Sequence, residues 1–183
     1  MRIGFSFTKK VEKSFLMSLP EFVTFKKGHS RKVSNLMKGS KNGVSWSIFD
    51  YRYTVGGGKN SHTYNQTVAF ASLNINLPNF SLTKENFFHK IGNIFGYKDI
   101  DFDNFPDFSK NYFLKGEDEQ SIRSIFTPEL LNYFQNNPTI LNVEANKNYL
   151  LYYKLSKRSK PEELISFIAE AAKIVRLFDK KEF

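Results

Sequence analysis

The sequence feature that most constrains the fold is a β-hairpin around three consecutive glycines. Residues 44–55 are rich in β-branched and aromatic side chains, and residues 63–77 continue in the same way after Gly56-Gly57-Gly58. Two such runs on either side of a glycine-rich turn are typical of paired antiparallel strands. We therefore predict strands over 44–55 and 63–77, joined by a turn at 56–61.

The apolar alternation within the first of these strands changes phase. Val44, Trp46 and Ile48 fall on one parity, and the following apolar residues, beginning with Phe49 and Tyr51, fall on the other. Either a one-residue bulge or a strand that passes between two packing environments produces such a switch.

Shorter segments extend the β-rich first half of the chain. Residues 3–7 alternate at the very start, and residues 22–25 follow Pro20 as a second short apolar run. In the second half, residues 141–146 alternate, and Asn146 to Asn148 is expected to turn the chain into a further strand over 149–155. Residues 99–103 alternate aspartates with apolar residues, which predicts an edge strand with the carboxylates in solvent.

Helices are expected mainly in the second half. Thr83 can cap a helix that ends at Gly96, Asp118 can cap a short one, and Thr127-Pro128 can start another. Residues 159–162 match a capping box before an amphipathic helix. Its apolar stripe consists of Leu164, Ile168, Ala171, Val175 and Phe178. Strands early and helices late, without regular alternation, predict one α+β domain over 1–183, with a mainly antiparallel sheet and three to four later helices.

Composition excludes several chemistries. The chain has no cysteine, so disulfides, thiolate metal sites and cysteine nucleophiles are absent. No apolar run is long enough to cross a bilayer, and charged residues interrupt the N-terminus too early for a signal peptide. We expect a soluble domain, and the aromatic residues, mostly phenylalanine, are best interpreted as core.

The net charge of +9 is carried entirely by the first third of the chain. Residues 1–60 hold twelve Lys and Arg against three acidic residues, whereas residues 61–183 are neutral. An asymmetry of this kind indicates a face turned toward an anionic partner or a surface that only aids solubility. A local acidic run at 99–119 is its counterpart, and we expect it to contact the basic third of the same chain or of a second copy.

The densest cationic stretch surrounds Gly28-His29-Ser30-Arg31-Lys32, which we interpret as a basic loop suited to phosphate or carboxylate. A solvated loop without a ligand is the alternative. The candidate anion-binding residues are Lys26, Lys27, His29, Ser30, Arg31, Lys32, Lys38, Lys41, Arg52 and Lys59. If the ligand is nucleic acid, Tyr51 and Tyr53 are the aromatic residues expected to stack on bases.

A second candidate site is a pocket near the glycine turn, formed by Asp50, Gly56, Gly57, Gly58 and His62. The glycines do not form a nucleotide-binding loop, because Tyr53 and Asn60 stand where a Walker A motif needs glycine and a hydroxyl residue. The three histidines show no metal-ligand spacing, and no catalytic motif is present. We therefore expect no cofactor and no metal, and a binding domain rather than an enzyme.

Seven short motifs follow one another along the chain: Gly28–Lys32, Phe49–Thr54, Gly58-Lys59, Gln66–Val68, Glu85–Gly92, Phe95–Phe102 and Lys160–Leu164. Taken together, they resemble a family of uncharacterised bacterial proteins that is common in cyanobacteria. The resemblance implies no known activity, but it implies a setting, since members of the family carry an N-terminal membrane anchor before this domain. The chain is then expected either to have been trimmed of such an anchor or to be a member free in solution.

Three functions remain open from the sequence. The first is a non-catalytic binding or scaffold domain at the cytoplasmic membrane face, where basic clusters attract anionic headgroups or an acidic protein. The second is a nucleic-acid-binding domain that uses the same cations. The third is a small-molecule enzyme or sensor with its site at the glycine turn. The oligomeric state is not predicted.

Overall fold

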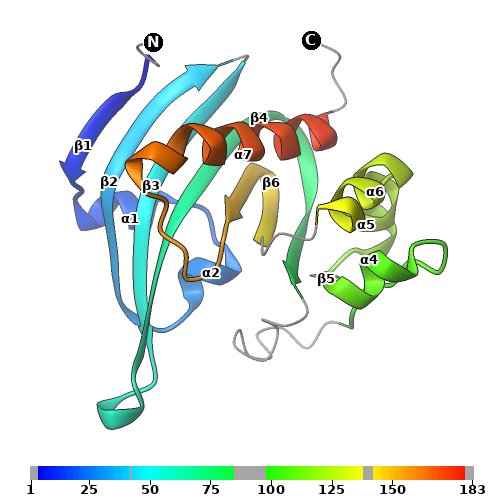
Figure 1. Ribbon diagram of the computed structural model, residues 1–183, viewed down its shortest axis with the longest axis horizontal. Coiled ribbons are helices and arrows are strands. Elements are labelled where there is room, and N and C mark those ends of the chain that lie inside the picture. Colours follow the sequence, from blue (N-terminus) through cyan, green and yellow to red (C-terminus); the bar gives the residue numbers. More distant parts are fainter. Residues whose placement is uncertain (1–3, 42, 85–97, 138–141, 180–183) are drawn as a thin grey trace.

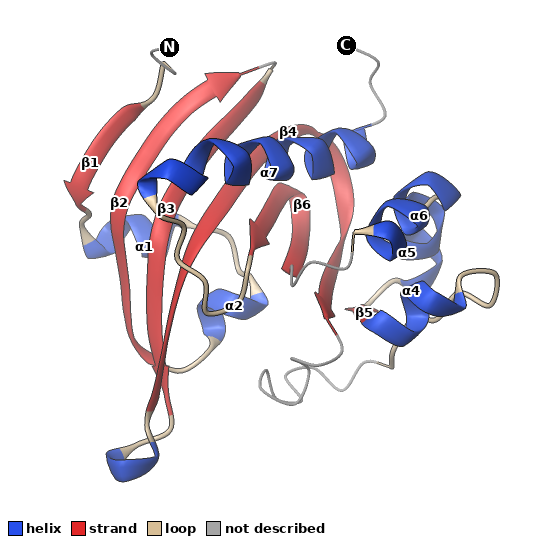
Figure 2. Ribbon diagram, in the orientation of Figure 1, coloured by secondary structure: helices blue, strands red, loops and turns tan. Residues whose placement is uncertain are grey.

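The computed structural model describes residues 4–41, 43–84, 98–137 and 142–179. The described residues form a central sheet of six strands, and helices lie on both faces of this sheet (Figures 1 and 2). The strands are β1 (Ser6–Lys10), β2 (His29–Lys41), β3 (Val44–Val55), β4 (His62–Lys84), β5 (Tyr112–Gly116) and β6 (Asn142–Tyr153). The helices are α1 (Lys13–Ser18), α2 (Val23–Lys26), α4 (Pro106–Asn111), α5 (Glu119–Ile125), α6 (Pro128–Asn136) and α7 (Leu164–Asp179).

Strand β4 connects the two parts of the sheet. Its first half pairs with β3, its second half pairs with β5, and β6 pairs with it along both halves, always antiparallel. Strands β1 and β2 extend the sheet beyond β3 in the order β1-β2-β3-β4-β5. The α+β class with a mainly antiparallel sheet is confirmed.

The two faces of the sheet have separate hydrophobic cores. On one face, which we call the α7 face, helix α7 packs with α4, α5 and α6 over one cluster of buried side chains. On the opposite face, the α2 face, α1 and α2 cover a second cluster that includes Phe22, Phe25, Phe49 and Tyr51. Figure 2 shows α7 lying across the strands, with α1 and α2 beyond the sheet.

The two faces explain the phase change in β3. Val44, Trp46 and Ile48 belong to the core under α7, whereas Phe49 and Tyr51 belong to the core under α2. The β3–β4 register runs without a shift from Ser45 to Val55, and the shift in the β2–β3 register places its extra residue on β2, between Ser34 and Met37, so β3 itself has no bulge. Of the two expected causes, the strand that passes between two packing environments is therefore correct.

The predicted hairpin and several helix ends are confirmed. The glycine turn joins β3 to β4, although the return strand extends to Lys84 rather than ending at Leu77. Asp118 accepts the Ser121 N–H as the cap of α5, and Thr127 caps α6 ahead of Pro128. The C-terminal amphipathic helix is α7, with Phe167, Ala171, Ile174, Val175 and Phe178 buried.

The capping box before α7 lies one residue later than predicted. The Lys160 N–H donates to the Glu163 carboxylate at 3.1 Å, and the Glu163 N–H donates to the Lys160 carbonyl. The backbone N–H of Ser159, the predicted cap, instead donates to the Thr67 hydroxyl. The fold thus uses Ser159 to attach this segment to β4.

Two predicted strands and one predicted turn were wrong. Residues 22–25 lie mostly in the one-turn helix α2. The expected hairpin at 141–155 is one strand, β6, because Lys147 adopts a positive φ where the pairing with β4 shifts register. Residues 99–103 form no strand, since the Asp99 carboxylate is used to accept the Leu114 N–H.

Thr83 does not begin a helix, because it lies inside β4, opposite Asn142. The rest of the helix expected up to Gly96 falls on residues outside the described part of the chain. Among the described residues, no helix is both long enough and apolar enough to cross a membrane.

Candidate functional site

The clearest candidate site is a cluster of exposed cations on the α7 face, beyond the part of the sheet that α7 covers. We call it the cationic cluster and define it as Lys32, Arg52 and Arg158 with the carboxylate of Asp50. Lys32 lies directly opposite Arg52 in the β2–β3 register, and both side chains are exposed. Asp50 is two residues from Arg52 on the same face of β3, which is about 7 Å along the strand.

Asp50 is the fixed centre of this cluster. Its Oδ1 accepts the Thr67 hydroxyl at 2.8 Å, and its Oδ2 accepts the Asn35 amide at 2.8 Å. Arg158 adds an ion pair from its Nε to Oδ2 at 2.7 Å. The carboxylate is recessed, with 17% of the side chain exposed, whereas 61% of the Arg158 side chain is exposed. The cluster therefore has a recessed carboxylate as its anchor, beneath an open cationic surface.

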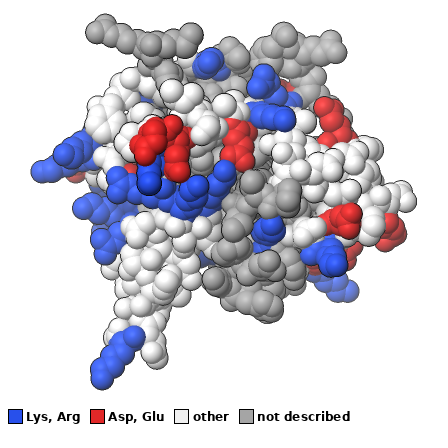
Figure 3. Space-filling view, viewed as in Figure 1, with Lys and Arg blue, Asp and Glu red and all other residues white. Residues whose placement is uncertain are grey.

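The surroundings of the cluster are basic. Figure 3 shows Lys and Arg side chains in a band on the β1–β3 side of this face, just below the start of α7, with acidic side chains above the band. The hairpin arm below it carries no charge until its tip, where Lys59 is exposed. The acidic run at 99–119 lies around α4 and α5, at the opposite end of the molecule from β1 and β2 (Figure 1), which contradicts the expected contact within one copy.

The predicted basic loop is in fact the start of strand β2, and its residues have separate roles. Arg31 donates to the carbonyls of Phe25, Lys26 and Gly28 at the end of α2, so its guanidinium is used within the fold. Gly28 has a φ of +58°, and a Cβ there would lie 2.1 Å from the Thr54 carbonyl oxygen.

Other predicted anion-binding residues are scattered. His29 contacts the Ser30 hydroxyl and the Gly56 carbonyl through its two ring nitrogens. Lys26 forms an ion pair with Glu21, and Lys38 lies 4.9 Å over the Phe15 ring on the α2 face. Lys41 and Lys59 are exposed at the far end of β2 and at the hairpin tip. Of the predicted set, the structure brings only Lys32 and Arg52 together in the cationic cluster.

The predicted pocket at the glycine turn is not assembled. Asp50 lies on the α7 face of the sheet. His62 lies opposite Val55 on the α2 face, where its ring contacts Tyr64. The two positions are five residues apart along the hairpin, or about 17 Å. Gly56, Gly57 and Gly58 form the exposed tip.

The tyrosines expected to stack on nucleic-acid bases are buried. Tyr51 is 1% exposed and Tyr53 is 2% exposed. The two rings stack at a centroid distance of 5.6 Å, and Tyr64 continues the stack at 5.0 Å from Tyr53. They are core residues of the α2 face and offer no surface to bases.

A second polar cluster, which the sequence did not reveal, lies buried beneath α2. The Glu144 carboxylate on β6 accepts the Thr24 N–H at 3.2 Å and the Tyr153 hydroxyl at 2.9 Å. Burial raises the pKa of Glu144, and nearby Lys27 acts in the opposite direction. Burial lowers the pKa of Lys27 to about 8, while the Glu144 charge opposes this shift. We call this the buried pair; because Lys27 is only 8% exposed, it is not a surface anion-binding residue.

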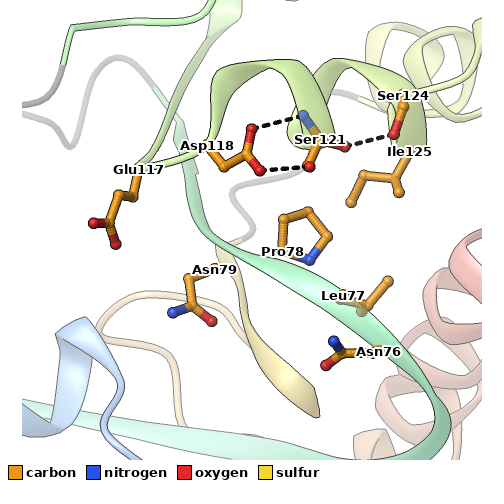
Figure 4. A pocket seen from close by; sticks show the side chains of 9 residues that line it. All are labelled: Asn76, Leu77, Pro78, Asn79, Glu117, Asp118, Ser121, Ser124 and Ile125. Atoms are coloured by element: carbon orange, nitrogen blue, oxygen red, sulfur yellow. Dashed lines mark hydrogen bonds between the residues drawn. The ribbon is translucent and has the colours of Figure 1, made fainter.

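A shallow groove of 460 Å³ lies between the β4 segment 76–79 and the start of α5 (Figure 4). Asp118 and Ser121 on its wall are already hydrogen-bonded to each other, and the Asn79 side chain accepts the Lys147 N–H. Its polar groups therefore serve mainly local structure. Within the described ranges, no three His, Asp or Glu side chains are grouped to hold a metal ion.

Sequence reasoning missed Arg158 and Glu144. Arg158 reaches Asp50 across 108 positions of sequence because Thr67 holds its neighbours: the Thr67 N–H donates to the Lys157 carbonyl, and the Thr67 hydroxyl accepts the Ser159 N–H. Glu144 was not singled out, because its alternation with Val143 and Ala145 is the ordinary pattern of a strand with one polar face. The available signal was the long apolar run that begins at Tyr149, which is typical of a strand covered on both faces.

Comparison with known proteins yields one structural likeness. The crystal structure of the mycobacterial trehalose monomycolate transport factor A, TtfA, superposes with a TM-score of 0.65 at 13% sequence identity. The match covers 97% of this chain and 86% of that chain. At this identity the likeness concerns the fold alone. No protein-family model matches the chain, and no curated protein matches it in sequence.

Proposed function

We propose that this chain is a non-catalytic binding domain that works beside the cytoplasmic face of a membrane and binds anionic headgroups through the cationic cluster. The observation that carries the proposal is the Lys32–Arg52 pair. Both side chains are exposed, they lie directly opposite each other on neighbouring strands, and neither forms an ion pair within the described residues.

The physical argument is that such a pair has an energetic cost in the free protein. Like charges directly opposite each other on a sheet destabilise it by a few tenths of a kcal/mol, up to about 1 kcal/mol. An anion bound between them removes the repulsion and adds charge-assisted hydrogen bonds. Anionic lipid surfaces attract cations by about 1 kcal/mol per Lys or Arg near the surface.

Two further facts support a membrane setting. The excess positive charge of the chain is confined to residues 1–60, and Lys and Arg side chains gather in a band on the face that Figure 3 shows. The fold is similar to that of TtfA, a factor in the transport of trehalose monomycolate. We extend that likeness to a role in handling lipids at a membrane, without assigning the same lipid.

Vesicle co-sedimentation tests the proposal. Phosphatidylcholine vesicles with increasing phosphatidylglycerol content are expected to bind the protein at low salt, with affinity falling as salt rises. The double variant Lys32→Glu/Arg52→Glu should lose this binding. The control Lys110→Glu/Arg176→Glu makes the same charge change at exposed positions on α4 and α7 and should retain it. Equal binding by the two double variants, or no binding by the wild type, rules the proposal out.

Nucleic acid and an acidic protein are the competing partners. Titration with single- and double-stranded oligonucleotides distinguishes the first, because phosphate contacts weaken steeply with salt. Oligonucleotide binding as tight as vesicle binding would shift the function to nucleic acid. If the protein binds neither vesicles nor oligonucleotides, the membrane proposal fails and an acidic protein is the remaining candidate partner for the basic face.

A further inference from the structure

We infer that the cationic cluster is a site for a phosphomonoester, in which Arg158 is oriented toward the ligand by Asp50. This inference rests on the proposed function and names the headgroup chemistry that the site selects. Loss of the Asp50 charge distinguishes such a site from a surface that is only positive. It should weaken phosphate binding if Asp50 orients Arg158, but it should not weaken binding to a surface that attracts anions by its net charge alone.

The first step of the argument is the way in which Arg158 is held. Its Nε lies 2.7 Å from Asp50 Oδ2, so an ion pair holds the guanidinium beside this carboxylate. The side chain is nonetheless 61% exposed, so the guanidinium remains open to a ligand from solvent. A planar guanidinium fixed in this way presents parallel N–H donors with the geometry that phosphate oxygens accept.

The second step is that the anchor itself is fixed. Asp50 accepts hydrogen bonds from Thr67 and Asn35 in addition to its contact with Arg158. The backbone on either side of Arg158 is attached to the same strand, because the Thr67 N–H donates to the Lys157 carbonyl at 3.1 Å and the Ser159 N–H donates to the Thr67 hydroxyl at 2.9 Å. Little conformational freedom therefore remains to be lost when an anion binds.

The third step is the charge of the cluster. Lys32, Arg52 and Arg158 carry three positive charges, and Asp50 carries one negative charge. The neighbouring Lys157 is already balanced by Glu163 at 3.8 Å. The remaining charge of two complements a phosphomonoester, whose second pKa of about 6 makes it largely dianionic at neutral pH. A phosphodiester or a carboxylate offers a single charge and matches less well.

The test compares two lipids at equal surface charge. Phosphatidylcholine vesicles carry either phosphatidic acid, a phosphomonoester, or cholesteryl hemisuccinate, a carboxylate, adjusted to the same zeta potential. The wild type is expected to bind the phosphatidic acid vesicles roughly tenfold more tightly, the effect of one additional charge-assisted hydrogen bond. That preference should fall as the pH drops below about 6, where the second phosphate proton returns.

Two variants test the orientation of Arg158. Asp50→Asn makes the protein more positive but releases the guanidinium, and Arg158→Lys keeps the charge but removes the planar donors. Both are expected to lose roughly tenfold in affinity for phosphatidic acid vesicles. The matched controls Glu129→Gln on α6 and Arg176→Lys on α7 make the same changes at exposed sites and should bind like the wild type. Circular dichroism melting checks the fold, and Arg158→Lys decides the question if Asp50→Asn does not fold.

The outcomes separate this inference from the proposed function. If Asp50→Asn binds as tightly as Glu129→Gln, and Arg158→Lys as tightly as Arg176→Lys, the surface is only diffusely positive and the inference is wrong, although membrane binding stands. If the wild type binds neither kind of vesicle, the proposed function fails. Titration with inorganic phosphate, monitored by the NMR chemical shifts of Arg52 and Arg158, shows whether the phosphate ligand is a lipid headgroup or a free phosphate. Shifts there without a preference for phosphatidic acid vesicles support the site with a free phosphate ligand, and no shifts with no preference contradict it.

Discussion

Two clusters that each combine a carboxylate with cations lie on opposite faces of the same sheet, and they differ in exposure. On the α7 face, Asp50 supports Arg158 beneath an open surface. On the α2 face, the Glu144 carboxylate lies beneath α2 and is 2% exposed. Charged residues of the same kind therefore have different uses in one protein. The open cluster remains available for a ligand, whereas the buried pair is committed to holding α2 against the sheet.

The difference follows from desolvation. Removing a charge from water costs several kcal/mol, which an ion pair recovers only with good hydrogen bonds. Glu144 has these from the Thr24 N–H and the Tyr153 hydroxyl, so the cluster specifies where α2 docks. At the cationic cluster most of this cost is absent, because water and counter-ions still reach Arg158, Arg52 and Lys32. The substitutions below test that contrast.

The largest expected effect is the loss of Glu144. Glu144→Ala removes two hydrogen-bond acceptors and leaves Lys27 buried without its opposite charge, which should lower the free energy of unfolding by about 3 kcal/mol. Urea unfolding followed by circular dichroism measures it. Glu129→Ala, at an exposed position of α6, is the control and should change stability by no more than about 0.5 kcal/mol. A loss below about 1 kcal/mol at Glu144 would mean that the buried pair does not hold α2.

Arg31 should behave as a structural residue despite its exposure. Arg31→Ala removes the donors to the carbonyls at the end of α2 and should cost about 2 kcal/mol in the same urea experiment. Arg31→Lys keeps the charge but not the planar fork, so it should recover less than half of the loss. Full recovery by lysine would show that only the charge at this position matters.

The buried pair also predicts a pH dependence of stability. With its pKa lowered to about 8, folded Lys27 loses its proton well before the unfolded residue does, near 10.5. The unfolded state binds more protons between these values, so stability should rise with pH in this window, by about 2 kcal/mol between pH 7.5 and 9.5. Unfolding of the wild type and Lys27→Met at both pH values measures it. The rise should be absent in the variant; an equal rise in both proteins would assign it to other groups.

The smallest expected effect on stability is at the open cluster, and its sign is reversed. Arg52→Thr relieves the repulsion from Lys32 and should raise the free energy of unfolding by about 0.5 kcal/mol while weakening vesicle binding. Lys41→Thr, at the exposed end of β2 opposite Val44, lacks a like-charged neighbour and should leave stability nearly unchanged. A destabilised Arg52→Thr protein would indicate that Arg52 supports the fold rather than a ligand.

Local sequence patterns predicted much of the fold but little of the site. The hairpin, the caps at Asp118 and Thr127 and the stripe of α7 depend on neighbours within a few residues, and they were correct. The short apolar run at 22–25 became helix α2, whose first turn is satisfied by Glu144, 120 residues away. A contact between residues so far apart in the sequence produces no pattern in the local sequence.

The candidate site shows the same division. The sequence located the excess positive charge in the first third of the chain, but it could not show that adjacent cations such as Arg31 and Lys32 lie on different faces of the sheet. Arg31 folds back onto α2, whereas Lys32 points to the opposite face of the sheet, because successive strand residues alternate. Arg158, in the neutral two thirds of the chain, enters the cluster only through the attachment of residues 157–159 to β4.

The most direct test of the central claim, that placement rather than net charge makes the binding surface, is vesicle binding by Arg31→Ala and Arg52→Ala measured side by side. Each variant loses one arginine from the basic third of the chain. We predict that Arg52→Ala loses most of its affinity for anionic vesicles at conditions where both proteins are folded, while Arg31→Ala binds like the wild type. Equal losses in the two variants would contradict the account.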